Sequence, residues 1–324
     1  MNDLGATVQT RADGTLRHLL TLEGLPRSQL EELLEEAQRY VRAPGERIPA
    51  SALLSGVTVA NLFTEPSTRT RVSFELAAKR LGAQVVNLEV QLSSRAKGES
   101  MLDTVYTLEA LHADVLVIRE AEAGVLGLVA SHVAPHVSVL SAGEAHIAHP
   151  TQGLLDALTV RQRKRSFENL SIAIVGDIRH SRVARSAYHA FRTLGVPELR
   201  IVAPPAFMPE ADEFAGCTRF GTLKTGLKDV DVVMMLRIQK ERMTQASLPD
   251  GDRYFAKFGL TPERLALAKP DAIVMHPQPM NRGIEIASDV ADGAQSAIRD
   301  QVRNGVAVRM AVLATVVRAP GAPA

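Results

Sequence analysis

Short apolar runs alternate with amphipathic segments along almost the whole chain. The runs are rich in Val, Ile and Leu, and most are followed by a segment whose apolar positions have helical spacing. Such runs predict strands buried on both faces, and their alternation with helices predicts parallel sheets. The predicted strands are 57–62, 84–88, 114–118, 137–140, 171–175, 199–203, 231–236 and 272–275. The predicted helices are 28–42, 71–81, 101–111, 124–132, 152–163, 182–194, 262–267 and 294–317.

The length and the distribution of strands predict two domains. The chain has 324 residues, and at about 150 residues per domain this gives about two. Four predicted strands precede residue 150 and four follow it. A C-terminal helix that returns to the first domain makes that domain discontinuous. We expect an α/β protein of two doubly wound parallel-sheet domains, 1–150 plus about 294–324 and 151–293, with the first dozen residues and the APGAPA tail as loose ends.

Composition excludes several classes of partner. The chain has 37 Lys and Arg residues and 36 Asp and Glu residues. Its net charge is therefore close to zero and gives no electrostatic field that would attract nucleic acid. Cys217 is the sole cysteine, which argues against a disulfide scaffold and against cysteine-based metal sites. No apolar run approaches the roughly 18 residues of a membrane span, and the N-terminal residues do not resemble a signal peptide. We therefore expect a cytoplasmic protein with no nucleic-acid or membrane partner.

Glycine spacing and short motifs exclude several enzyme classes. No two glycines are separated by a single residue, so the GxGxxG dinucleotide fingerprint is absent. The pair Gly221 and Gly226 has the spacing of a P-loop, but Leu227 follows where that motif needs Lys. The chain also lacks HExxH, an EF-hand loop and GxSxG. A dinucleotide-binding dehydrogenase, a P-loop NTPase, a zincin and an α/β-hydrolase are all disfavoured.

Hydroxyl and guanidinium side chains are concentrated where the first predicted strand runs into a helix. Residues 63–71 read Phe-Thr-Glu-Pro-Ser-Thr-Arg-Thr-Arg, and ligands of open α/β sheets bind at the carboxyl ends of strands. Helix N-termini favour anions, and Arg adds charge-assisted hydrogen bonds to phosphate. An ordinary helix cap accounts for one hydroxyl, but not for three hydroxyls with two arginines. The segment predicts an anion site.

Other strand ends carry Arg, His or Gln as well. Taken singly, a solvated Arg or a hydrogen-bonded His would explain each one. His146 and His149 have the HxxH spacing of a metal pair, but no third ligand is nearby and a buried hydrogen-bonding His is the commoner outcome. Together, at one predicted face, these side chains indicate a pocket for a doubly anionic set of ligands. The strand-end residues are Arg119, His149, Gln152, Asp177, Arg182, Arg237, Gln239 and His276.

An ordered set of motifs resembles the aspartate and ornithine carbamoyltransferase family. The matches run from residue 57 to residue 283, with spacing like that of the family. Arg237-x-Gln239 resembles the aspartate branch of the family. The ornithine branch has His-Cys-Leu-Pro where this chain has His276-Pro277-Gln278-Pro279, and the missing cysteine disfavours ornithine. The matching segments are 67–71, 97–99, 119, 149–152, 177–182, 237–239 and 276–277.

The resemblance implies the reaction. Carbamoyl phosphate and L-aspartate give N-carbamoyl-L-aspartate and phosphate, in pyrimidine biosynthesis. The electrophile already carries a good leaving group, so neither a covalent nucleophile, a cofactor nor a metal is expected. The site must supply orientation, desolvation and stabilisation of charge on the carbonyl oxygen. The resemblance also implies an active site in the cleft between a carbamoyl-phosphate-binding domain, 1–150 with about 294–324, and an aspartate-binding domain, 151–293.

Individual roles follow from the resemblance, position by position. Arg69, Thr70, Arg119 and His149 are the implied catalytic residues, of which the last three polarise the carbonyl oxygen. The residues implied for carbamoyl phosphate are Ser67, Thr68, Arg69, Thr70, Ser93, Lys97, Arg119, His149, Gln152 and the backbone around Pro277 and Gln278. The residues implied for aspartate are Lys97, Arg182, Arg237 and Gln239.

The resemblance further implies a homotrimer with shared active sites. Ser93 and Lys97 match residues that the family supplies from a neighbouring subunit. The sequence leaves open a larger assembly with regulatory or dihydroorotase-like chains, and it leaves open whether the residues before 16 are regulatory or a disordered tail. Two alternative functions are a carbamoyltransferase for another amino acid and a non-catalytic paralogue. The intact Ser67–Arg71 signature, Arg119 and His149 count against the paralogue.

Overall fold

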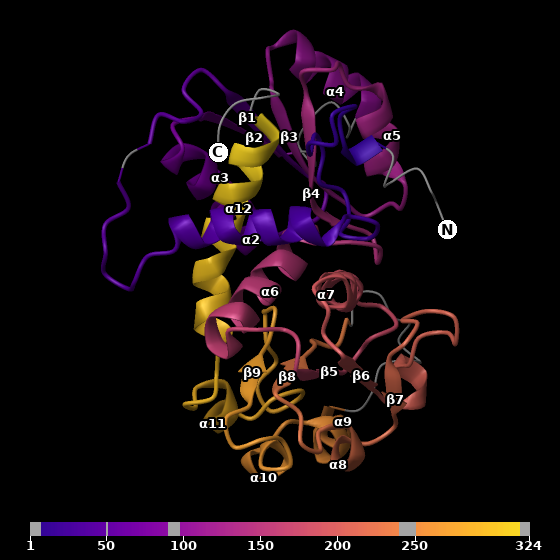
Figure 1. Cartoon of the computed structure of the whole chain (residues 1–324). Coiled ribbons are helices and arrows are strands. Elements are labelled where there is room, and N and C mark those ends of the chain that lie inside the picture. The colour runs from indigo at the N-terminus through magenta and orange to yellow at the C-terminus, as the bar shows by residue number, and fades with distance from the viewer. Residues whose placement is uncertain (1–7, 50, 90–97, 240–250, 318–324) are drawn as a thin grey trace. The chain divides into compact units, whose positions relative to one another are not determined.

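The chain forms two compact units, each with its own parallel sheet (Figure 1). The computed structural model describes residues 8–49, 51–89, 98–239 and 251–317. Unit 1 comprises Met1–Leu154 and Arg303–Ala324, and unit 2 comprises Leu155–Val302. Both boundaries fall inside helices, α6 (Pro150–Lys164) and α12 (Ile298–Val317). Unit 1 is therefore discontinuous in sequence.

Unit 1 contains a four-stranded parallel sheet in the order β2-β1-β3-β4. The second strand lies on one side of β1 and the later strands lie on the other. The chain thus reverses its winding direction between β1 and β3, which makes this the switch point of the sheet. The strands are β1 (Thr58–Phe63), β2 (Gln84–Glu89), β3 (Val115–Glu120) and β4 (Ser138–Glu144). Among the described residues this unit also has the helices α2 (Arg27–Tyr40), α3 (Thr68–Arg80), α4 (Met101–Ala110) and α5 (Val125–His132).

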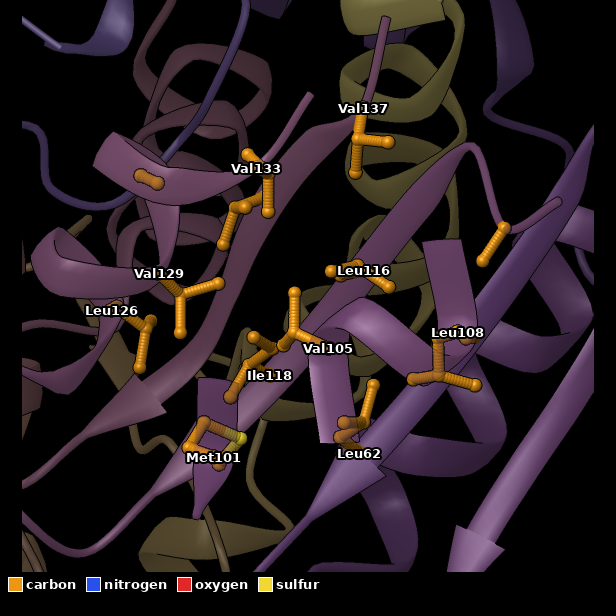
Figure 2. Close-up of a cluster of buried hydrophobic side chains, with 14 of the residues drawn as sticks. Leu62, Met101, Val105, Leu108, Leu116, Ile118, Leu126, Val129, Val133 and Val137 are labelled. Atoms are coloured by element: carbon orange, nitrogen blue, oxygen red, sulfur yellow. The ribbon is translucent and has the colours of Figure 1, made fainter. Parts of the chain in front are cut away.

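The core of unit 1 fixes these strands against their helices. Figure 2 shows Leu62 of β1 and Ile118 of β3 in one cluster with Val105 of α4 and Val129 of α5. All four side chains are fully buried. Burying a large aliphatic side chain stabilises a fold by about 1.5–3 kcal/mol, so the cluster holds the strand ends in place.

The first described residues are packed against the rest of unit 1. Gln9 is fully buried, and its Oε1 accepts a hydrogen bond from the backbone N–H of Leu20 at 2.6 Å. Arg11 Nη2 donates to the carbonyl of Val316 in α12 at 2.7 Å. The expectation that the first dozen residues are loose is therefore wrong for Gln9 and Arg11, whose side chains bond to backbone groups later in the chain.

Unit 2 contains a five-stranded parallel sheet in the order β7-β6-β5-β8-β9. Its switch point lies between β5 and β8. The strands are β5 (Ser171–Val175), β6 (Glu198–Val202), β7 (Thr218–Phe220), β8 (Val232–Met235) and β9 (Ile273–Met275). The helical segments are α7 (Arg182–Thr193), η3 (Pro205–Phe207), α8 (Leu223–Gly226), α9 (Gly251–Phe258), α10 (Pro262–Leu265) and α11 (Ser288–Ala291).

All eight predicted strands are present, and the prediction of two parallel-sheet α/β units is confirmed. Strand β7 was not predicted, because its three residues at the sheet edge form no apolar run. The short helices α8, α9 and α11 were also missed, and the last helix begins at Ile298 rather than at residue 294. No helix among the described residues is both long and apolar enough to cross a bilayer.

Candidate functional site

The segment after β1 is tied to the end of β3 at the switch point of unit 1. Phe63 lies opposite Arg119 in the parallel register. The backbone N–H of Thr64 donates to the carbonyl of Arg119 at 3.0 Å, and Thr64 Oγ1 lies 3.0 Å from Glu120 Oε1, to which it donates. These bonds set the direction in which the chain leaves β1 and enters α3.

Helix α3 begins without a side-chain cap, in contrast to α4, α7, α8 and α10. Ser67 is its N-cap residue, but the Ser67 side chain accepts no hydrogen bond from the first turn. Ser100, in the same position at α4, accepts from the backbone N–H of Asp103. Ser181, Thr222 and Thr261 cap their helices in the same way. The first turn of α3 therefore presents N–H groups that no cap occupies, as an anion site requires.

The hydroxyl and guanidinium groups of the predicted anion site differ in burial. Thr70 is buried, Thr68 and Arg69 are exposed, and Ser67 is half-buried. A ligand at the start of α3 can thus meet backbone N–H groups together with an exposed guanidinium. This combination suits a phosphate, which accepts charge-assisted hydrogen bonds from Arg.

Arg119 is held by a carboxylate from the segment after β1. Its Nε lies 3.1 Å from Oε2 of Glu65, and its Nη1 donates to the carbonyl of Ala142 at 3.3 Å. The side chain is mostly buried, with 14% of its surface exposed. Glu65 was not among the predicted site residues, although it stands inside the 63–71 segment. An acidic residue in an otherwise cationic segment was the signal that could have identified it.

His149 and Gln152 follow β4, the neighbour of β3. His149 directly precedes α6, and its carbonyl accepts from the backbone N–H of Gln152 at 2.9 Å. Both side chains are buried, whereas His146 is exposed. His146 and His149 therefore differ in environment, and within the described residues no group of three or more His, Cys, Asp or Glu could hold a metal ion.

Two buried carboxylates lie at the same edge of this sheet. Glu120 and Glu144 are register partners on β3 and β4. Glu144 Oε1 accepts from the backbone N–H of Leu126 at the start of α5, at 3.0 Å. Burial raises the pKa of Glu144, and the nearby charge of Glu120 adds to this effect. The carboxylates use backbone and hydroxyl donors, so they position loops at this edge.

The switch point of unit 2 joins Asp177, after β5, to Gln239, after β8. Asp177 Oδ2 accepts from the backbone N–H of Gln239 at 3.2 Å, and Oδ1 lies 2.8 Å from His180 Nδ1. Arg237 Nη2 donates to Gln239 Oε1 at 3.3 Å. Arg182 is buried in the first turn of α7, which follows β5. Guanidinium and amide groups thus gather at this edge, where they can bind carboxylates.

Close approach at this switch point requires a glycine. Gly176 has a φ of 125°, a conformation that L residues rarely adopt. A Cβ at this position would lie 2.9 Å from the carbonyl oxygen of Leu236. Glycine therefore lets the ends of β5 and β8 approach each other.

The loop after β9 is built around a buried histidine. His276 Nδ1 accepts from the backbone N–H of Gln278 at 2.9 Å, and Nε2 lies 3.2 Å from Oε1 of Glu285. Pro277 and Gln278 are half-buried, and Gln278 has a φ of 55°. Glu285 was not predicted, because it stands in a loop without periodicity nine positions beyond His276.

The structure gathers the predicted residues in two sets, each at the carboxyl edge of one sheet. Ser93 and Lys97 lie outside the described residues. In unit 1 the set is Ser67, Thr68, Arg69, Thr70, Arg119, His149 and Gln152, and in unit 2 it is Arg182, Arg237, Gln239, Pro277 and Gln278.

Two family models match nearly the whole chain. Residues 17–162 match "Aspartate/ornithine carbamoyltransferase, carbamoyl-P binding domain". Residues 168–316 match "Aspartate/ornithine carbamoyltransferase, Asp/Orn binding domain". The two matches cover both sheets and all the described candidate residues.

Solved structures of carbamoyltransferases have the same fold. Aspartate transcarbamoylase from Trypanosoma cruzi, in complex with carbamoyl aspartate and phosphate, is 32% identical with a TM-score of 0.84, covering 95% of this chain and 98% of that one. The same enzyme in complex with N-(phosphonacetyl)-L-aspartic acid is 31% identical with a TM-score of 0.79, covering 98% of this chain and 99% of that one. Ornithine carbamoyltransferase from Pyrococcus furiosus is 27% identical with a TM-score of 0.81, covering 93% of this chain and 97% of that one.

Proposed function

The chain belongs to the aspartate/ornithine carbamoyltransferase family, and from that premise we propose that it transfers the carbamoyl group of carbamoyl phosphate to the amine of L-aspartate. The products are N-carbamoyl-L-aspartate and phosphate, in pyrimidine biosynthesis. The observation that carries the proposal is the uncapped start of α3 beside Arg119 at a sheet switch point. That arrangement suits a phosphate whose neighbouring carbonyl needs polarising.

Carbamoyl phosphate is assigned to unit 1. The first turn of α3 and the Arg69 guanidinium hold the phosphate, with Ser67, Thr68 and Thr70 as hydroxyl donors. Arg119 and His149, with Thr70, stabilise charge on the carbonyl oxygen as the amine attacks. Gln152 accepts from the carbamoyl NH2, and the resemblance implies the same role for the backbone carbonyls around Pro277 and Gln278. The corresponding domain ranges are those predicted from the sequence, 1–150 with about 294–324 and 151–293.

Aspartate is assigned to the guanidinium and amide groups of unit 2. Arg237 and Gln239 are fixed to each other and, through Asp177, to the end of β5. Arg182 adds a second guanidinium, which is buried, near the same strand end. Two guanidinium groups match the two carboxylates of aspartate, whereas ornithine carries only one.

The chemistry needs no covalent nucleophile, because phosphate is already a good leaving group. The amine of aspartate must lose a proton to attack the carbonyl carbon. As the C–N bond forms and the C–O bond to phosphate breaks, the departing phosphate can accept a proton from the amine. The residues named above therefore act by orientation and electrostatic stabilisation.

A homotrimer with shared sites is part of the proposal. Val86 on the edge strand β2, and Val72 and Leu76 on α3, are exposed apolar side chains. The segment with Ser93 and Lys97 follows β2 directly. A second copy that covers these apolar side chains would receive Ser93 and Lys97 at its phosphate site. A cytoplasmic location also remains a prediction, which cell fractionation tests.

Hybrid trimers test the shared site. Lys97→Ala and His149→Ala should each be nearly inactive, but a mixed trimer contains an interface that joins an intact Lys97 segment to an intact His149 pocket. Dissociated and reassembled mixtures should therefore regain activity. Mixtures as inactive as the parents, with hybrids confirmed by mass, would refute shared sites.

A comparison of acceptors tests the reaction itself. Purified chain is supplied with carbamoyl phosphate and either L-aspartate or L-ornithine, and the carbamoylated product is measured. We expect turnover with aspartate and at most trace turnover with ornithine. Faster turnover with ornithine would overturn the assignment, and no turnover with either would favour a non-catalytic paralogue.

A further inference from the structure

Arg309 is a buried cation in α12 that has no carboxylate partner among the described residues. It belongs to unit 1, and only 4% of its surface is exposed. Nη1 donates to the carbonyl of Gly305, one turn earlier in the same helix, at 2.8 Å, whereas Nε has no hydrogen-bond partner within the described part of the chain. Burial lowers the pKa of Arg309 to about 10, and no neighbouring charge contributes. The side chain therefore stays charged at neutral pH.

The stability of the core does not require a charge at this position. Desolvation makes a buried charge costly, so buried cations are normally paired with a carboxylate. An apolar side chain of similar length can fill the same space without that cost, and such replacements are often neutral or stabilising. The charge of Arg309 thus has a cost in the folded chain, which one bond within its own helix offsets only in part.

Arg309 contacts α3, the helix whose first turn is the predicted anion site. Its Cζ lies 5.0 Å from the centre of the Phe74 ring, within the range of a cation–π contact. Phe74 stands four residues after Thr70, so the two lie on one face of α3, and both are buried. Side chains on a helix lean toward its N-terminus, so the ring covers the turn that contains Thr70. The contact therefore places the charge of Arg309 beneath the first turns of α3.

We propose that Arg309 is a specificity-determining residue whose charge attracts a dianion to the first turn of α3 without contacting it. The proposal rests on the phosphate site of the proposed function. Water and salt screen a buried charge much less than a surface charge, so the field of Arg309 reaches the start of the helix. It acts in the same direction as the helix dipole. Because the Coulomb energy is proportional to the charge of the ligand, a dianion gains twice as much as a monoanion of the same shape.

The experiment compares two anions of the same shape that differ by one charge. Methylphosphonate is a dianion and methanesulfonate a monoanion at a pH between the second pKa of methylphosphonate and the pKa of Arg309. NMR titration at constant ionic strength measures both dissociation constants, because it can follow weak ligands. Arg309→Met keeps an unbranched side chain and removes the charge. It should weaken methylphosphonate at least about fivefold and methanesulfonate about twofold, and its urea unfolding midpoint should stay the same or rise.

Arg17→Met is the matched control. Arg17 is a half-buried residue of unit 1, and its Nη2 donates to the carbonyls of Val133 and Ala134 at 3.2 Å and 2.7 Å. Both carbonyls precede β4, so this charge lies at the amino edge of the sheet, whereas α3 starts at the carboxyl edge. The substitution changes the net charge by the same amount and should change both dissociation constants by less than about twofold.

The variants decide the role of Arg309. A folded Arg309→Met chain that binds methylphosphonate like wild type, or that loses affinity for both anions by the same factor, overturns the electrostatic role. An equal loss in Arg17→Met overturns it as well. If only methylphosphonate binds measurably, its loss in Arg309→Met against that in Arg17→Met decides. If Arg309→Met does not fold, Arg309→Gln replaces it, since it is neutral and can still donate to the Gly305 carbonyl.

The wild-type chain tests the premise separately. A wild-type chain that binds neither anion refutes the phosphate site and the role of Arg309 with it. A wild-type chain that binds methylphosphonate but makes no carbamoyl-aspartate refutes only the proposed function. A competent wild type with an unaltered Arg309→Met variant refutes only the role of Arg309.

Discussion

The guanidinium of Arg119 lies 3.1 Å from the carboxylate of Glu65, across the switch point of unit 1. The Glu65 carboxylate lies beside Nε of this guanidinium, and Nη1 donates to the Ala142 carbonyl at 3.3 Å. Glu65 thus helps to hold the side chain in one orientation. An anion placed at α3 competes with Glu65 for the same positive charge.

Arg119→Ala should lower kcat/KM by at least about a hundredfold, the loss expected for one major electrostatic donor. Its urea unfolding midpoint should change little. Arg27→Ala is the matched control, because Arg27 pairs with Glu31 on the exposed surface of α2, and steady-state kinetics should not distinguish it from wild type. Near wild-type kcat/KM in Arg119→Ala would remove Arg119 from the site.

Ser67 and Ser100 are both helix N-cap residues, but substituting them should affect the free energy of unfolding to different extents. Ser100→Ala removes a cap from α4 and should destabilise the protein by about 0.5–2 kcal/mol. Ser67 caps nothing, so Ser67→Ala should change stability by less than about 0.5 kcal/mol. Urea titration gives both values. Inorganic phosphate should stabilise wild type and Ser100→Ala, and stabilise Ser67→Ala less. A large loss of stability in Ser67→Ala would show a structural cap instead.

Arg237→Ala should affect the acceptor substrate selectively. The Arg237 and Gln239 side chains are fixed at the end of β8 in unit 2, while the phosphate residues belong to unit 1. The KM for aspartate should rise at least about tenfold, as for a lost charge-assisted contact. Stabilisation by phosphate should be unchanged. If a folded Arg237→Ala chain lost affinity for aspartate and for phosphate equally, the division of the two substrates between the units would be contradicted.

His18 should make stability fall between pH 7 and pH 5. Burial, with the charges of Arg17 and Arg11, lowers the pKa of His18 from 6.5 to about 3. Below pH 6.5 the unfolded chain binds a proton that the native state excludes, so native stability falls as the pH drops toward 3. At pH 5 this loss amounts to about 2 kcal/mol.

His18→Asn keeps an acceptor for the Val139 N–H, which donates to His18 Nδ1 at 2.8 Å, and removes the titration. Its stability should therefore fall less between pH 7 and pH 5, by about that amount. Urea unfolding at both values measures the difference. His136→Asn, at an exposed position, should keep the wild-type dependence. Parallel pH profiles for wild type and His18→Asn would contradict the assignment.

The sequence was sufficient to predict those strands whose own residues form a continuous apolar run. Strands such as β5 are buried on both faces, so their continuous apolar runs are visible without any tertiary knowledge. Strand β7 lies at the edge and contains Thr218 and Arg219, so no run marks it. Helices α8 and α11 have four residues each, too few for an apolar period.

In the candidate site, too, some residues could be predicted from the sequence and others could not. Polar residues at strand ends were predictable because parallel strands bring their carboxyl ends to one edge. The partners of those residues were not, since the Glu65–Arg119 and Glu285–His276 contacts depend on how two loops meet. The burial of Gln9 was equally hidden, because its backbone partner belongs to a later turn.

The bond between Arg11 and the Val316 carbonyl has a consequence for synthesis. Unit 2 ends at Val302, so on the ribosome all of its residues exist before unit 1 is complete. Domains fold as units during translation, and here the unit that begins first must finish last. A chain truncated inside α12 before Val316 would keep every residue of unit 2 but lose the carbonyl to which Arg11 donates, so the truncation would damage packing about 300 residues earlier in the sequence.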